Sequence, residues 1–83
     1  MSTVHSTDVR TAITEIFATV LSLPGDQVTG SAHFYDDLGG DSLQKLEVVA
    51  HLEAAFDCRL SNEEAAENDT VDAFVRLVGE RAA

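Results

Sequence analysis

The sequence has few of the residues that build disulfides, metal clusters or nucleic-acid-binding surfaces. Its 83 residues include one cysteine, one proline, no tryptophan, and only five lysines and arginines against 15 aspartates and glutamates. A single cysteine excludes an internal disulfide and a multi-cysteine metal site, and we expect Cys58 to be half-buried rather than reactive. The net charge of −10 argues against nucleic acid as a partner and favours partners with a basic surface.

Long apolar runs are also missing. The sequence has no stretch of about 18 apolar residues, the length needed to span a membrane, and residues 1–10 lack the apolar core of a signal peptide. We therefore expect a cytoplasmic protein that does not contact membranes. The length suits one domain, residues 1–83 with flexible ends at 1–7 and 82–83, and is too short for large enzyme folds. We expect a discrete, monomeric protein.

The spacing of apolar residues predicts an all-α fold, a four-helix bundle with three longer helices and one short helix. The first helix is predicted over residues 8–22, because the residue before Pro24 avoids helical geometry. The second is predicted from Ser42 to Phe56, a short third over 62–67, and a fourth from Val71 to about Arg81. The sequence shows no strand alternation.

Polar residues at the predicted helix starts support these boundaries. Asp41 with Gln44, and Ser61 with Glu64, have the spacing of capping boxes, and Thr70 can cap the last helix.

The connection over residues 24–40 is long for a small bundle, and long loops are usually either functional or disordered. Val28, Phe34 and Leu38 are apolar and predict an ordered loop that is pinned to the core.

The segment from Asp36 to Leu43 carries the most functional information. Its two glycines permit a tight turn, and Asp41 supplies the helix cap, so the Ser42 hydroxyl is left free at a helix N-terminus. Such an end favours phosphate, which makes Ser42 a candidate for a phosphate-containing modification. Two other interpretations of this segment are disfavoured. A hydrolase nucleophile would need G-x-S-x-G, which the sequence around Ser42 lacks, and a calcium-binding loop would need glycine where Asp41 stands. The remaining alternative is that Ser42 is only a residue at the start of a helix and carries no modification.

The sequence D-L-G-G-D-S-L, residues 37–43, resembles the attachment motif of acyl and peptidyl carrier proteins. The resemblance continues through the predicted second and third helices to the entry of the last helix, and covers roughly residues 8–80. In that family the serine of the D-S-L core carries 4′-phosphopantetheine through a phosphodiester. The resemblance therefore implies an acyl-carrier-protein-like fold, with Ser42 as the attachment site flanked by Asp41 and Leu43.

The resemblance also implies how the protein works. A separate phosphopantetheinyl transferase would transfer the arm from coenzyme A to Ser42, and the thiol of the arm would hold an acyl or aminoacyl group as a thioester. The protein would not itself be an enzyme and would need no metal. It would present tethered cargo at high effective concentration to an acyltransferase or ligase, a ketosynthase or similar enzymes with basic docking patches.

The predicted second helix is apolar on two sides. One side suits the core and contains Val48, Val49, Leu52 and Phe56. A second apolar stripe, Leu43, Leu46 and Ala50, lies beside the carboxylates of Glu47 and Glu53 and is a candidate partner surface. On that stripe we expect Leu43 to be exposed, and Leu46 could be exposed or buried. Lys45 and His51 are expected to soften the acidity of this helix, that is, to reduce its net negative charge. By position in the family, the docking residues would be Leu43, Leu46, Glu47, Ala50 and Glu53, with Glu63, Glu64 and Glu67 on the short helix.

The departures from the family pattern concern the pathway. Gly40 before the D-S pair is more typical of peptidyl and polyketide carriers than of fatty-acid carriers, where alanine is frequent. We therefore expect an acyl carrier of polyketide or related natural-product biosynthesis, or of fatty acid biosynthesis. Two alternatives stay open: an aminoacyl or peptidyl carrier of nonribosomal-peptide-type assembly, and an acidic helical adaptor that carries no modification.

Overall fold

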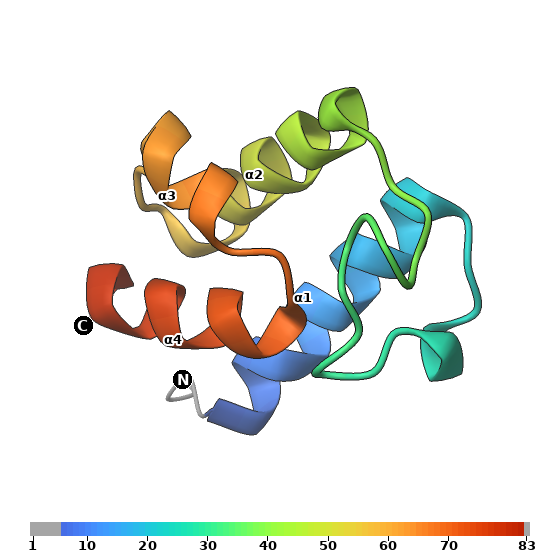
Figure 1. Ribbon diagram of the computed structural model, residues 1–83. Coiled ribbons are helices and arrows are strands. Elements are labelled where there is room, and N and C mark those ends of the chain that lie inside the picture. The colour runs from blue at the N-terminus through green and yellow to red at the C-terminus, as the bar shows by residue number, and fades with distance from the viewer. Residues whose placement is uncertain (1–5, 83) are drawn as a thin grey trace.

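The computed structural model describes residues 6–82, whose regular elements are helices joined by turns and loops, with no strand, as the apolar spacing predicts (Figure 1). The helices are α1 (Ser6–Leu21), α2 (Ser42–Phe56), α3 (Asn62–Glu67) and α4 (Val71–Ala82), with a 3₁₀ turn, η1, over Gly25–Gln27. Both α2 and α3 have the predicted bounds. The flexibility predicted for 1–7 and 82–83 stays a prediction: residues 6, 7 and 82 are helical, and the others lie outside the described part.

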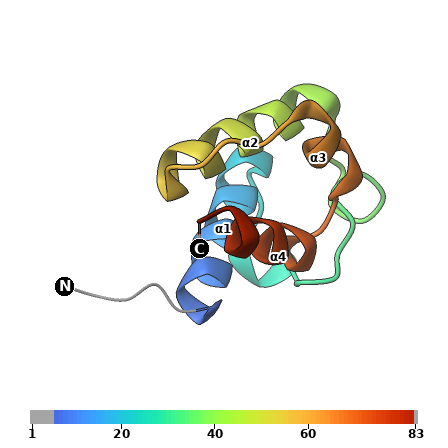
Figure 2. The ribbon, with the colours of Figure 1, turned by 90° about the vertical axis from the view of Figure 1, so that its left-hand side faces the viewer.

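Helix α1 packs against both α2 and α4, and α3 lies against α2 (Figures 1 and 2). Three fully buried phenylalanines, from three different segments, fill the space between them. The ring of Phe17 in α1 lies edge-on to Phe34, with centroids 5.5 Å apart, and to Phe74 of α4 at 5.9 Å. Edge-to-face aromatic pairs of this kind add to the free energy gained from burial alone. No helix in residues 6–82 is long and apolar enough to cross a membrane.

The predicted caps of the last two helices are present. Ser61 Oγ accepts from the backbone N–H of Glu64 at 3.0 Å, and the Glu64 side chain accepts from the N–H of Ser61 at 2.9 Å. Thr70 Oγ1 accepts from the N–H of Ala73 at 3.0 Å. Each such cap contributes roughly 1 kcal/mol, which matters in a domain with a small core.

Ion pairs connect the helices near their ends. Arg10 of α1 pairs with Asp72 of α4, and Arg81 of α4 pairs with Glu64 of α3. The Arg10 pair lies where both side chains are about half exposed, so it contributes little net stability.

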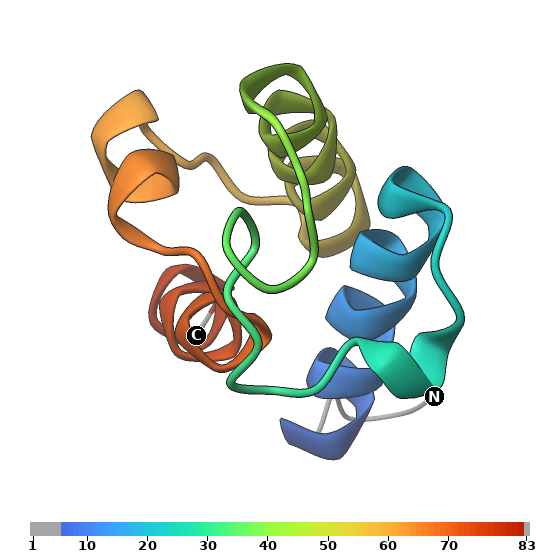
Figure 3. The ribbon, with the colours of Figure 1, turned by 45° about the vertical axis from the view of Figure 1, so that its right-hand side comes forward.

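The connection between α1 and α2 is an ordered loop that lies among the helices (Figure 3). Val28 and Phe34 are buried, and Leu38 is half-buried against the core. These are the three residues that the sequence predicts as anchors. The turn η1 is an addition that the sequence did not indicate.

Candidate functional site

The part of this loop nearest to α2, residues 33–40, is built around Phe34. The Phe34 N–H donates to the carbonyl oxygen of Asp69 at 2.7 Å, and its own carbonyl accepts from the N–H of Gly40 at 2.9 Å. The first bond fixes the loop to the linker between α3 and α4. The second closes the loop on itself just before α2 begins.

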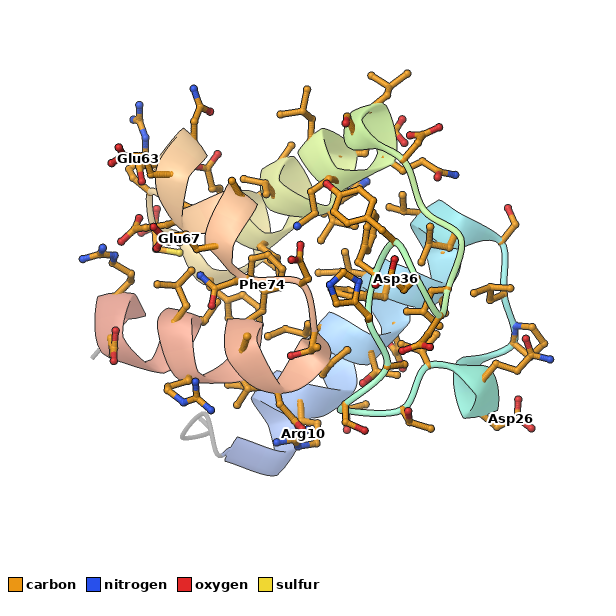
Figure 4. The ribbon with its side chains drawn as sticks, viewed as in Figure 1. Arg10, Asp26, Asp36, Glu63, Glu67 and Phe74 are labelled. Carbon is orange, nitrogen blue, oxygen red and sulfur yellow. The ribbon has the colours of Figure 1, made fainter. Side chains whose placement is uncertain are left out.

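Hydrogen bonds between His33 and the residues that follow it hold this loop together. The His33 N–H donates to Asp37 Oδ2 at 2.7 Å, and His33 Nδ1 accepts from the N–H groups of Tyr35 and Asp36 at 3.2 and 3.3 Å. Figure 4 shows Asp36 on this loop, between α2 and α4. Because Nδ1 accepts two hydrogen bonds, the neutral His33 ring carries its proton on Nε2.

The two glycines before α2 have different physical roles. Gly39 has φ +74°, which is left-handed backbone that side chains other than glycine adopt at a cost. Gly40 has ordinary φ, but its Cα lies directly on the Phe34 ring, and a Cβ there would lie within 2.8 Å of three ring carbons. Close packing on Phe34 therefore explains why glycine precedes the D-S pair.

Ser42 is the first residue of α2 and is exposed to solvent. Asp41 is the N-cap: its Oδ1 accepts from the N–H of Gln44 at 2.8 Å, and Gln44 Oε1 accepts from the N–H of Asp41 at 3.0 Å. The predicted capping box is therefore present. Because Asp41 satisfies the cap, the Ser42 hydroxyl is not needed for it.

One face of α2 presents apolar side chains to solvent. Leu43 is 68% exposed and Leu46 is 58% exposed, with Glu47 and Ala50 exposed on the same helix. The expected exposure of Leu43 is confirmed, and Leu46, whose position the sequence left open, is exposed as well. The opposite face is buried, through Val48, Val49 and Leu52, and Phe56 is half-buried against the core.

The carboxylates proposed for docking fall into two groups. Glu47, Glu63 and Glu67 are exposed, and Figure 4 shows Glu63 and Glu67 on α3 away from the core. Glu53 and Glu64 are half-buried and also stabilise the fold, because Glu53 Oε2 accepts from the N–H of Leu60 at 2.8 Å and Glu64 caps α3 and pairs with Arg81. The sequence alone did not indicate these structural roles.

Lys45 does not soften the acidity of α2, so that expectation is wrong. Its side chain is buried, and its Nζ lies 2.5 Å from Oδ1 of Asp69. His51 is exposed on the same helix. A signal for Lys45 was present in the sequence, because it stands three and seven residues before Val48 and Leu52, in register with the inward face.

Most of the basic residues are paired within the fold. Three of the five lysines and arginines form ion pairs with carboxylates of other segments: Arg10, Lys45 and Arg81. Of these three only Lys45 lies on α2, and its burial leaves no lysine or arginine on the solvent-facing side of that helix.

Cys58, just after α2, is half-buried as predicted. Burial raises the pKa of its thiol, the neighbouring carboxylates of Glu53 and Asp57 raise it further, and Arg81 acts in the opposite direction. A raised pKa disfavours the reactive thiolate. The described residues also contain no group of three or more side chains placed to hold a metal ion.

The bundle thus has a glycine turn that leads to an exposed serine at the start of its second helix, which is the arrangement that the resemblance to carrier proteins implied. The family model described as "Phosphopantetheine attachment site" matches residues 11–78 of this chain. The match covers most of the sequence, and the chain belongs to this family. It is therefore a carrier domain to which 4′-phosphopantetheine is attached covalently, as the motif implied.

Proposed function

We propose that Ser42 is the residue that carries 4′-phosphopantetheine in this chain. The observation that supports this most directly is the exposure of Ser42 at the first position of α2, while Asp41 supplies the N-cap. The remaining N–H groups of the first turn and the helix dipole favour a phosphate at this end. The residues present therefore fit a phosphodiester at Ser42 Oγ.

The chain's own contribution is to hold the attachment point. In the loading step Ser42 Oγ would attack the phosphorus of coenzyme A that bears the pantetheine. The pyrophosphate P–O bond would break, adenosine 3′,5′-bisphosphate would leave, and the hydroxyl proton would pass to the separate transferase. Once attached, the arm supplies a thiol on which an acyl group is held as a thioester. The loop anchored by Phe34 and the cap at Asp41 fix where the arm begins, so tethered cargo is presented at high effective concentration.

The exposed face of α2 is the proposed docking surface for partner enzymes. Leu43, Leu46 and Ala50 offer apolar contact within about two turns of Ser42, and Glu47 adds charge beside them. Glu63 and Glu67 on α3 extend the acidic area. Partners with basic patches suit this surface: the phosphopantetheinyl transferase and enzymes such as an acyltransferase, a ligase or a ketosynthase. Glu53 contributes mainly through its negative potential, because a hydrogen bond within the fold holds its side chain, whereas the ion pair with Arg81 offsets the charge of Glu64.

The pathway we propose is polyketide or related natural-product assembly. Gly40 supports it, since the resemblance associates glycine at this position with polyketide and peptidyl carriers. An aminoacyl or peptidyl carrier is the alternative that the same residue supports. The cytoplasmic location and the monomeric state stay predictions from the sequence.

Intact-mass measurement tests the attachment site. The protein is incubated with coenzyme A and a phosphopantetheinyl transferase of broad specificity, alongside Ser42→Ala and the control Ser31→Ala, which alters another exposed serine. We expect the wild type and Ser31→Ala to gain the mass of one arm and Ser42→Ala to gain nothing while keeping its helical circular dichroism. A gain in Ser42→Ala, or none in the wild type, would refute the assignment, and the second result would favour the unmodified adaptor.

A further inference from the structure

An ion pair between a buried lysine and a half-buried aspartate lies about one helical turn from Ser42. Lys45 of α2 is 4% exposed, and its Nζ lies 2.5 Å from Oδ1 of Asp69 in the linker between α3 and α4. The same ammonium lies 5.0 to 5.7 Å from the ring centroids of Tyr35, Phe34 and Phe74. Contacts of a cation with aromatic faces at this range are attractive, most of all when water is excluded.

The carboxylate of Asp69 is held from more than one side. Its Oδ2 lies 3.5 Å from Nε2 of His33, the nitrogen that carries the ring proton, and its backbone carbonyl accepts from the N–H of Phe34. Asp69 therefore connects α2, the loop at 33–40 and its own linker, and the last two lie side by side (Figure 3). The Asp69 side chain is 24% exposed, so the ion pair lies at the outer edge of the interior.

The layer beneath this pair is filled. The rings of Phe34 and Phe74 are fully buried and both contact Phe17 edge-on. Figure 4 shows Phe74 of α4 in the interior, between α4 and α2. An aliphatic chain entering between α2 and the linker would have to separate Lys45 from Asp69 and displace an aromatic ring. It offers no hydrogen bond to either charge, and a buried charge without its partner is strongly unfavourable.

We propose that the Lys45–Asp69 pair closes the interior of this bundle to aliphatic cargo, so that the group carried on Ser42 stays at the surface. The inference rests on the proposed attachment at Ser42. It also restricts the cargo to short or polar acyl groups, because these lose little free energy by remaining in water, whereas a long alkyl chain would remain exposed.

The test compares acetyl and octanoyl groups on the pantetheine arm of the wild type. Loading is first confirmed by intact mass, so a failure of Ser42 modification is seen separately from a failure of this inference. The measurements are the rate at which hydroxylamine cleaves each thioester and the midpoint of thermal unfolding. We expect equal cleavage rates for the two thioesters and no rise of the midpoint on octanoylation. Slower cleavage of the octanoyl thioester together with a raised midpoint would show that the chain enters the bundle and would overturn the proposal.

A double substitution tests the role assigned to the ion pair. Lys45→Met/Asp69→Leu removes both charges and keeps approximately the same volume. We expect octanoyl cleavage to slow by about tenfold relative to acetyl, which corresponds to a chain buried for roughly nine-tenths of the time. If this variant is not helical by circular dichroism, Lys45→Met/Asp69→Asn replaces it. Equal cleavage of both thioesters in a folded variant would show that the pair is not what closes the interior.

Discussion

The contact between Gly40 and Phe34 gives the sharpest test of how the loop positions the serine. In Gly40→Ala the added methyl would lie within 2.8 Å of three carbons of the Phe34 ring. The ring has no free space in which to move, because it is fully buried, contacts Phe17 edge-on and lies beside the Lys45 ammonium. Overpacking of this kind costs about 1–3 kcal/mol. In a domain of this size each kcal/mol lowers the unfolding midpoint by about 4–8 °C.

The assay is thermal unfolding followed by circular dichroism, with two other glycines as controls. Gly79 is exposed within α4 and has nothing within 4 Å of an added Cβ, so Gly79→Ala should stabilise the helix by about 0.5–1 kcal/mol. Gly39→Ala meets no atom but has φ +74°, and should cost about 1–2 kcal/mol through backbone strain alone. The double variant Gly40→Ala/Phe34→Leu should lose less free energy of unfolding than the sum of the losses in the two single variants. A Gly40→Ala protein that unfolds at or above the wild-type midpoint would refute the packing argument.

Three further changes probe the cap, the docking surface and the cysteine. Asp41→Ala should lower the free energy of unfolding in urea by about 0.5–2 kcal/mol, because the first turn of α2 loses its cap, and an unchanged midpoint would count against that role. Glu47→Lys should raise the KM of the transferase, most at low salt, whereas Glu80→Lys, the same charge change on exposed α4, should not; equal effects would argue for net charge rather than a docking surface. Iodoacetamide at pH 8 should alkylate Cys58 more slowly than free cysteine, since burial first and then Glu53 raise the pKa of the thiol and reduce the thiolate fraction at that pH; an equal rate would contradict this.

Local patterns were sufficient to place the helices. The boundaries of α2 and α3 follow from capping pairs that lie three residues apart, so the sequence contains both partners within one turn. The start of α1 was predicted two residues too late and its end one residue too late. The end differs because Ser22 takes left-handed backbone with φ 57° before Leu23 and Pro24. Such a residue ends a helix without the glycine that usually marks it.

Contacts between distant segments could not be predicted in the same way. Lys45 and Asp69 are 24 residues apart, and only the fold shows that a lysine on the inward face of α2 has a carboxylate opposite it. Glu53 was predicted as a docking residue from its position in the resembling family. Its bond to the N–H of Leu60 depends on how the chain turns after α2, and helical spacing does not contain that information.

The arrangement of the proposed site has a consequence for how partners use it. Ser42 is at one end of α2, and the exposed Leu43, Leu46 and Glu47 follow within two turns. An enzyme that reaches an arm on Ser42 while docking on α2 covers those same residues, so two partners cannot bind at once. If docking on α2 is as proposed, successive enzymes would have to release the carrier quickly, which favours weak, salt-sensitive contact over a large buried interface. An acidic face from which Lys45 has been withdrawn into the core suits that requirement, because electrostatic attraction speeds encounter more than it prolongs binding.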